Sequence, residues 1–224
     1  MQNDNDKINS GDKVNDFIQR NRKGIFIVLG TLVALFLGVV AYFSISDNLN
    51  KKATAELDEL TARYAEFNFL EDDDYLADEV SVLLEDVKAF AAKSRGFPGS
   101  KAWSYAALIY SGRKDWHNAR DAWLNSASSG DKTYMGPIAL FNAAAAEEEL
   151  GNEEEALLLL QKCIAHKFEF PAAPRAQFSI GRLYESKEDY ESALEAYRAV
   201  LINWPNMPVW QHLARSRITA LEIK

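Results

Sequence analysis

The sequence has few of the residues on which catalysis, metal binding and disulfide bonding depend. It contains one cysteine, Cys163, so no intramolecular disulfide can form. The three histidines, His117, His166 and His212, lie far apart and lack the spacing of metal ligands. A glycine-rich phosphate loop and a nucleophile elbow are both missing from the sequence. We therefore expect a protein that is not an enzyme and that binds no cofactor or metal.

Long apolar runs are scarce as well, and the only one covers residues 25–45. These 21 residues carry no charge, and in a helix they would span roughly 30 Å, the thickness of a bilayer's hydrocarbon core. The run predicts a transmembrane helix. A cleaved signal peptide is the alternative, because small residues near positions 39–46 have cleavage spacing, although signal-peptide cores are typically about 7 to 15 residues.

Charges beside the apolar run predict its orientation. Arg20, Arg22 and Lys23 precede it, whereas Lys51 and Lys52 follow at a greater distance. Because the more basic flank stays in the cytoplasm, residues 1–24 are expected to be cytoplasmic and the rest of the chain to lie across the membrane.

Two further features limit the partners of the chain. Gly30, Ala34 and Gly38 place small residues on one face of the apolar helix, where another helix can approach closely. Residues 46–224 hold 20 basic and 29 acidic side chains. An acidic domain is repelled by nucleic acid and by anionic lipid headgroups, so we expect neither as its partner.

The second half of the chain repeats itself. Ala119, Ala156 and Ala193 are 37 residues apart, and each is followed four residues later by a large apolar residue. These large residues are Trp123, Leu160 and Tyr197. A turn and another apolar-patterned segment precede each alanine. Pairs of antiparallel helices repeating at this period predict an all-α helical solenoid.

Residues 174–207 resemble a tetratricopeptide repeat. The side chains on its signature positions are Ile180, Gly181, Tyr184, Ala193, Tyr197 and Pro205. Small residues at 181 and 193 let the two helices cross closely, and the proline ends the second helix. Residues 100–136 and 137–173 are weaker copies, in which Ala107 and Ala144 replace the glycine.

These patterns predict the organisation of the chain. A cytoplasmic segment (1–24) is followed by the transmembrane helix (25–45), then by a helical linker with a degenerate first helix pair (46–98). The repeats occupy 99–207, and a capping helix closes the array at 208–224.

The resemblance implies a protein-binding groove on the concave face, which the first helix of each pair lines. The groove residues carried over from the repeat pattern are Leu108, Ile138, Phe141, Arg175, Phe178 and Arg182. An apolar peptide, extended or helical, is the expected ligand. Whether the helices of residues 48–94 cover part of this groove is left open at this point.

The order of the parts is similar to that of the bacterial ancillary subunit of the Sec translocon. That resemblance implies an inner-membrane protein with a cytoplasmic N-terminus and a periplasmic repeat domain. Its implied role is an adaptor that passes exported envelope proteins to periplasmic chaperones. The alternative is a structural scaffold for cell division or outer-membrane assembly, whose copies would associate through Gly30, Ala34 and Gly38.

Overall fold

The computed structural model describes residues 4–68 and 74–223, and all regular secondary structure in these ranges is α-helical. The helices are α1 (Asp4–Asn68), α2 (Asp74–Lys93), α3 (Gly96–Gly112), α4 (Trp116–Ser129), α5 (Met135–Glu149), α6 (Glu153–Ile164), α7 (Ala173–Ser186), α8 (Tyr190–Asn203) and α9 (Pro208–Glu222). The chain divides into two compact units, Met1–Lys52 and Ala53–Lys224.

The first unit consists of the N-terminal part of α1. Among the described residues, one stretch is long and apolar enough to cross a membrane, Phe17–Ala41, whose most apolar window has a mean hydropathy of 2.7. None of its most apolar window is buried. A signal sequence near the N-terminus would have the same length and composition. The stretch begins earlier than the expected span at residues 25–45, because it takes in Phe17 and Ile18 beside the basic cluster.

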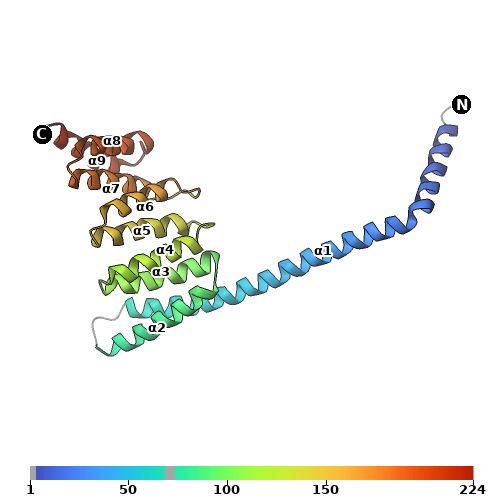
Figure 1. Cartoon of the computed structure of the whole chain (residues 1–224), viewed down its shortest axis with the longest axis horizontal. Coiled ribbons are helices and arrows are strands. Elements are labelled where there is room, and N and C mark those ends of the chain that lie inside the picture. Colours follow the sequence, from blue (N-terminus) through green and yellow to red (C-terminus); the bar gives the residue numbers. More distant parts are fainter. Residues whose placement is uncertain (1–3, 69–73, 224) are drawn as a thin grey trace. The chain divides into compact units, whose positions relative to one another are not determined.

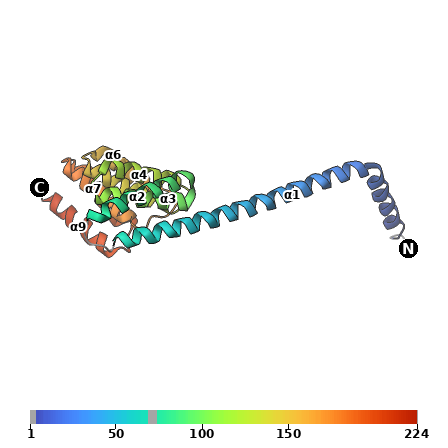
Figure 2. The same cartoon turned by 90° about the horizontal axis from the view of Figure 1, so that it is seen from below.

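In the second unit, helices α2 to α9 follow one another as a stack (Figures 1 and 2). Consecutive helices pair as hairpins, α3 with α4, α5 with α6 and α7 with α8, and α9 packs on α8. The expected all-α solenoid of helical hairpins is therefore confirmed. The acidic residues 71–74 predict a break between two helices, but residues 69–73 lie outside the described residues.

The 37-residue period of the sequence marks the centre of each hairpin. Ala119, Ala156 and Ala193 are fully buried on the second helices. On the facing first helix, α7 carries Gly181, where an added β-carbon would lie 2.6 Å from Cε1 of Tyr197. Residue 181 must therefore be glycine for this tyrosine to fit. In the two other hairpins Ala107 and Ala144 occupy the matching, fully buried positions.

The turn inside each hairpin has one recurring backbone conformation. Lys114, Gly151 and Glu188 are 37 residues apart and have positive φ angles of 57°, 77° and 60°. At the first turn, the N–H of Asp115 donates to the carbonyl of Tyr110 over 2.9 Å, and that of Lys114 to Ser111 over 3.0 Å. Matching pairs of bonds close the other two turns. This is the left-handed helix ending that glycine adopts most readily.

The last part of α1 belongs to the second unit and forms its first layer. Leu57 and Leu60 are buried there, and Tyr64 stacks on Tyr105 of α3 with ring centroids 4.5 Å apart. The Tyr105 hydroxyl donates to Thr61 over 3.0 Å. Residues 53–68 are thus helical and pack on the start of the repeat array.

Candidate functional site

The six expected groove residues lie on the first helices α3, α5 and α7, but they differ in exposure. Leu108 on α3 is 40 % exposed, so the described parts of α1 and α2 do not bury it. Ile138 and Phe141 on α5 are half-buried and pack against the core. On α7, Arg175 and Arg182 are exposed and Phe178 is half-buried.

Phe141 has partners that the repeat pattern did not predict. Its ring lies against Phe170, with centroids 5.5 Å apart, and Phe170 is buried in the connection between α6 and α7. The guanidinium of Arg175 lies over the same ring at 5.1 Å from its centroid, within cation–π range. Phe141 and Arg175 therefore act together, and a ligand here would meet a cation covering an aromatic ring.

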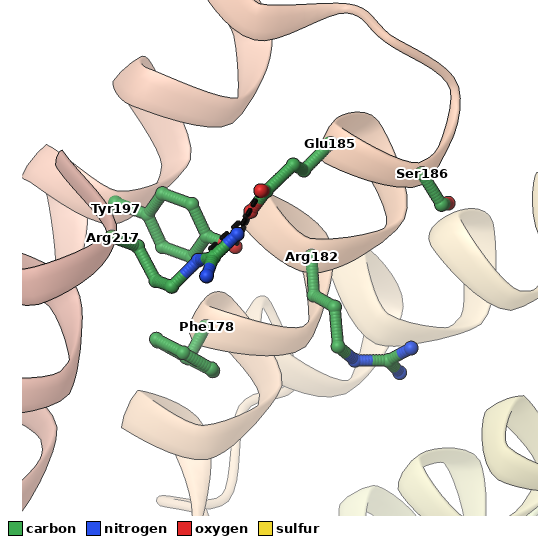
Figure 3. A pocket seen from close by; sticks show the side chains of 6 residues that line it. All are labelled: Phe178, Arg182, Glu185, Ser186, Tyr197 and Arg217. Atoms are coloured by element: carbon green, nitrogen blue, oxygen red, sulfur yellow. Dashed lines mark hydrogen bonds and ion pairs between the residues drawn. The ribbon is translucent and has the colours of Figure 1, made fainter. Parts of the chain in front are cut away.

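Phe178 is the aromatic residue around which a pocket forms. The pocket has a volume of about 470 Å³ and is lined by Phe178, Arg182, Glu185, Ser186, Tyr197 and Arg217. Figure 3 shows Phe178 with Arg217 on one side and Arg182 on the other. The ring of Phe178 also contacts Trp210, with centroids 5.8 Å apart. The structure thus brings Phe178 and Arg182 together in the lining of one pocket.

The capping helix α9 supplies one pocket residue that the sequence did not identify, Arg217, and also Trp210, whose ring contacts Phe178. The sequence predicts a capping helix at residues 208–224. It gave no sign that α9 turns these side chains toward α7. The sequence pattern of α9 indicates its orientation only weakly, because α9 buries only Ala214 and Leu221. Its apolar residues therefore do not define one inner face.

Ion pairs and hydrogen bonds fix the polar side of the pocket. Arg217 pairs with the carboxylate of Glu185, and the Tyr197 hydroxyl donates to the same carboxylate over 2.9 Å. Burial, together with this carboxylate, raises the pKa of Tyr197 to about 12. The hydrogen bond to Glu185 raises the pKa of Arg217. Tyr197 therefore stays a neutral donor and Arg217 a cation throughout the physiological range.

Arg182 pairs with Glu148 of the preceding first helix, α5. The arginine side chain is 51 % exposed, and an ion pair this close to solvent contributes only about 0–1 kcal/mol. A carboxylate from a ligand could replace Glu148 at little cost. The pocket therefore combines an aromatic floor with an arginine whose present partner is exchangeable.

Within the described ranges, no cluster of three or more His, Cys, Asp or Glu residues has a geometry suited to a metal ion. His117 and His212 are exposed on α4 and α9, whereas His166 follows α6 and stacks on Phe168. Cys163 is fully buried on α6, and burial raises its pKa to about 12. A neutral thiol in this position packs as a small apolar residue and is a poor nucleophile.

Comparisons with known proteins agree with this geometry. Family models described as tetratricopeptide repeat match residues 138–166 and 174–201. A "TPR repeat-containing protein" of Treponema pallidum (strain Nichols) is 33 % identical over 128 residues. The match covers 57 % of this chain and 53 % of the relative, so the chain spans about half the length of the curated relative that it matches.

Solved structures support the fold alone, because their sequence identity is low. The nearly identical TPR-like repeats of a Podospora anserina kinesin light chain have a TM-score of 0.52 at 14 % identity. The matched region covers 74 % of this chain and 91 % of that structure. A single-substitution variant of the same repeats has a TM-score of 0.53 with the same coverage of both chains. This fold is typically a non-enzymatic scaffold for protein–protein interaction. The chain is therefore an all-α solenoid of helical hairpins in which residues 138–166 and 174–201 match tetratricopeptide repeats.

Proposed function

We propose that this protein is a membrane-tethered adaptor that binds partner proteins through the groove of its repeats. The apolar part of α1 would span the bacterial inner membrane with residues 1–24 in the cytoplasm, and the repeats would lie in the periplasm. The adaptor would pass exported envelope proteins from the translocon to periplasmic chaperones. The topology is supported by the length of the apolar stretch and by the basic residues before it, and the partner class by the resemblance in the order of parts.

The observation that carries the proposal is the pocket around Phe178. An apolar side chain of a bound peptide would pack on the Phe178 ring, beside Trp210. An acidic side chain one or two residues away would pair with Arg182 in place of Glu148. Phe141 under Arg175 provides a second aromatic and cationic position on the neighbouring repeat. Together with Leu108 and Ile138, these residues would favour a short segment with alternating apolar and acidic side chains.

Site-specific photo-crosslinking in the full chain tests this proposal. A photoreactive side chain replaces Phe178 in membranes that contain the native partners, and the matched control replaces Leu158, which is 43 % exposed on the second helix α6. We expect adducts with translocon or periplasmic chaperone subunits from position 178 only. Arg182→Glu should reduce them, because it replaces the cation with an anion beside Glu148.

Two results would contradict the proposal. Equal adducts from positions 178 and 158 would show that the groove is not the binding surface. Adducts with cytoplasmic proteins alone would overturn the topology and the export role together. Protease treatment of spheroplasts gives an independent test of topology, since only a periplasmic repeat domain would be digested.

A structural scaffold is the second candidate, and the small-residue face of α1 is the feature that favours it. An added β-carbon at Gly30 or Gly38 would have no neighbouring atom within 4 Å, so this face is uncovered in a single chain. In a scaffold, copies would pack through Gly30, Ala34 and Gly38. Replacing both glycines by leucine should then abolish oligomers in mild detergent, and unchanged oligomers would exclude this mode of association.

A further inference from the structure

One edge of the repeat stack exposes aromatic side chains. We call it the loop edge and define it as residues 93–97, 130–134 and 165–172, where one hairpin connects to the next. Phe97, Tyr134 and Phe168 on these connections are 37 %, 56 % and 36 % exposed. Large aromatic side chains usually lie in the core, so three on successive connections call for an explanation.

Direct contacts join the three connections into one surface. The rings of Phe97 and Tyr134 have centroids 5.7 Å apart, which links the first connection to the second. Asp131 pairs with Lys167 over 3.0 Å, which links the second to the third. The Lys167 ammonium also lies 5.7 Å from the centroid of the Phe168 ring. The aromatic residues therefore belong to a continuous strip with lysines between them.

The loop edge is basic, although the domain as a whole is acidic. It holds four basic side chains, Lys93, Arg95, Lys132 and Lys167, against two acidic ones, Asp131 and Glu169. The opposite edge consists of the turns inside the hairpins, residues 112–116, 149–155 and 186–190. There, three basic side chains face seven acidic ones. Exposed aromatic rings together with lysine and arginine are the side chains typical of a membrane–water interface.

The chain enters the second unit at this same edge. Consecutive helices are antiparallel, so the start of residues 53–68 lies beside the end of α2. Glu56 and Glu59 line one small cavity together with Phe90 and Lys93. Only residues 42–52 separate Ala41, the end of the apolar stretch, from Ala53.

We propose that the loop edge lies against the headgroup region of the bilayer that α1 spans. Phe97, Tyr134 and Phe168 would insert their rings at the interface. Lys132 and Lys167 would reach lipid phosphates with their ammonium groups while their alkyl chains pack beside the rings. This inference rests on the proposed membrane span, because the span is what would hold the edge close to lipid. The occupant is the membrane, and a protein partner at this edge is the competing outcome of the test.

Fluorescence quenching by lipids in the reconstituted full chain tests the proposal. The background is Cys163→Ala, and single cysteines at Tyr134 or Phe168 carry an environment-sensitive dye. A cysteine at Lys187 reports on the opposite edge, and one at Leu35 reports on the apolar stretch. The vesicles contain phosphatidylcholine and phosphatidylglycerol, with spin labels either at the headgroup or deep in the acyl chains.

We expect the headgroup label to quench the dyes at 134 and 168 and to shift their emission to the blue, with little change at 187. The deep label should quench the dye at 35. Phe97→Ser together with Phe168→Ser should release the dye at 134 from quenching. Tyr190→Ser on the opposite edge, the matched control, should not.

Each contrary outcome is distinct. If the dyes at positions 134 and 168 are as little quenched as the dye at 187, while the dye at 35 is quenched, then α1 spans the membrane but the loop edge does not touch the bilayer. If 35 is not quenched, the membrane span and this inference both fail. If lipid does not change the emission of the dye at position 134 but a partner protein shifts it, the loop edge is a protein-binding surface and the membrane proposal is overturned.

Discussion

Gly181 on α7 faces the ring of Tyr197 on α8 so closely that a β-carbon at residue 181 would lie 2.6 Å from Cε1. Gly181→Ala must therefore move a tyrosine that is almost completely buried. Overpacking of this kind costs about 1–3 kcal/mol, and we expect that loss in the free energy of unfolding by urea in mild detergent.

The neighbouring hairpin suggests a compensating change. It places Ala144 and Leu160 where the last hairpin has Gly181 and Tyr197. Tyr197→Leu in the Gly181→Ala background should therefore recover part of the lost stability. Gly112→Ala is the control, since nothing lies within 4 Å of its added β-carbon. It should stabilise by about 0.5–1 kcal/mol, and equal losses at 112 and 181 would contradict the close-packing explanation.

The turns inside the hairpins predict stabilising glycine substitutions. Lys114 and Glu188 have φ angles of 57° and 60°, where the equivalent residue of the middle turn is Gly151. Because side chains other than glycine cost about 1–2 kcal/mol in this conformation, Lys114→Gly and Glu188→Gly should each raise the free energy of unfolding. After allowance for the flexibility of glycine in the unfolded chain, the gain is about 0.5–1 kcal/mol.

Gly151→Ala provides the reverse test and should destabilise by a similar amount. Unfolding by urea, monitored by circular dichroism, measures all three variants. If Lys114→Gly and Glu188→Gly both lower the free energy of unfolding, these turns do not keep the left-handed conformation in solution.

Aspartates at the starts of α4 and α8 predict a loss of stability in acid. The carboxylate of Asp115 accepts from the Asn118 side chain over 2.7 Å and from its backbone N–H over 3.3 Å, and Asp189 accepts from the N–H of Ser192 over 3.1 Å. The hydrogen bond from the Asn118 side chain is the main cause that lowers the pKa of Asp115 below the ordinary value of 3.8. For Asp189, hydrogen bonding from the Ser192 side chain, followed by that from the Ser192 backbone N–H, lowers the pKa below the same value. The stabilisation is thus complete above about pH 3.8 and is lost as the pH falls through the lower, folded-state pKa.

Asparagine separates the charge of these caps from their hydrogen bonds. Asp115→Asn and Asp189→Asn keep a capping oxygen at neutral pH but have no carboxyl group to protonate. We expect thermal unfolding midpoints that depend less on pH below 3.8 than those of the parent chain. An unchanged acid dependence in the double variant would assign acid unfolding to other carboxylates.

Glu147 on α5 is a charged residue that is only 5 % exposed. We expect higher stability when Glu147 and its ion-pair partner are replaced by the residues at the equivalent positions of the next repeat. The Glu147 carboxylate accepts from the Asn152 amide over 2.7 Å and lies 3.7 Å from the Arg120 guanidinium. The equivalent positions of the next repeat hold Leu157 and Tyr184, which pack in the core cluster.

Glu147→Ala should destabilise by about 1–3 kcal/mol, because it leaves polar groups without a partner. Arg120→Leu combined with Glu147→Tyr should be more stable than either single variant, since an apolar pair replaces a largely buried ion pair. A double-mutant cycle of urea unfolding measures the coupling. Additive effects would show that the two positions do not interact.

Much of the fold was predictable because hairpin repeats have a strong local signal. The 37-residue spacing of Ala119, Ala156 and Ala193 located the hairpins, since each crossing point needs a small residue on the second helix. The site was less predictable. Phe178 and Arg182 were placed on one face by helical spacing, but the contacts of Phe141 with Phe170 and Arg175 depend on a connection whose path the sequence does not specify.

The sequence by itself determined the apolar stretch, the helical period and the positions at which helices cross, because each depends on residues close together in the chain. The tertiary structure decided which groove residues are covered and which are open. Arg217 reaches Glu185 from α9 across 32 residues, and Arg182 reaches Glu148 across 34. Such pairs form only once neighbouring repeats have stacked, because the distance between their side chains is set by the packing of the helices and not by local sequence.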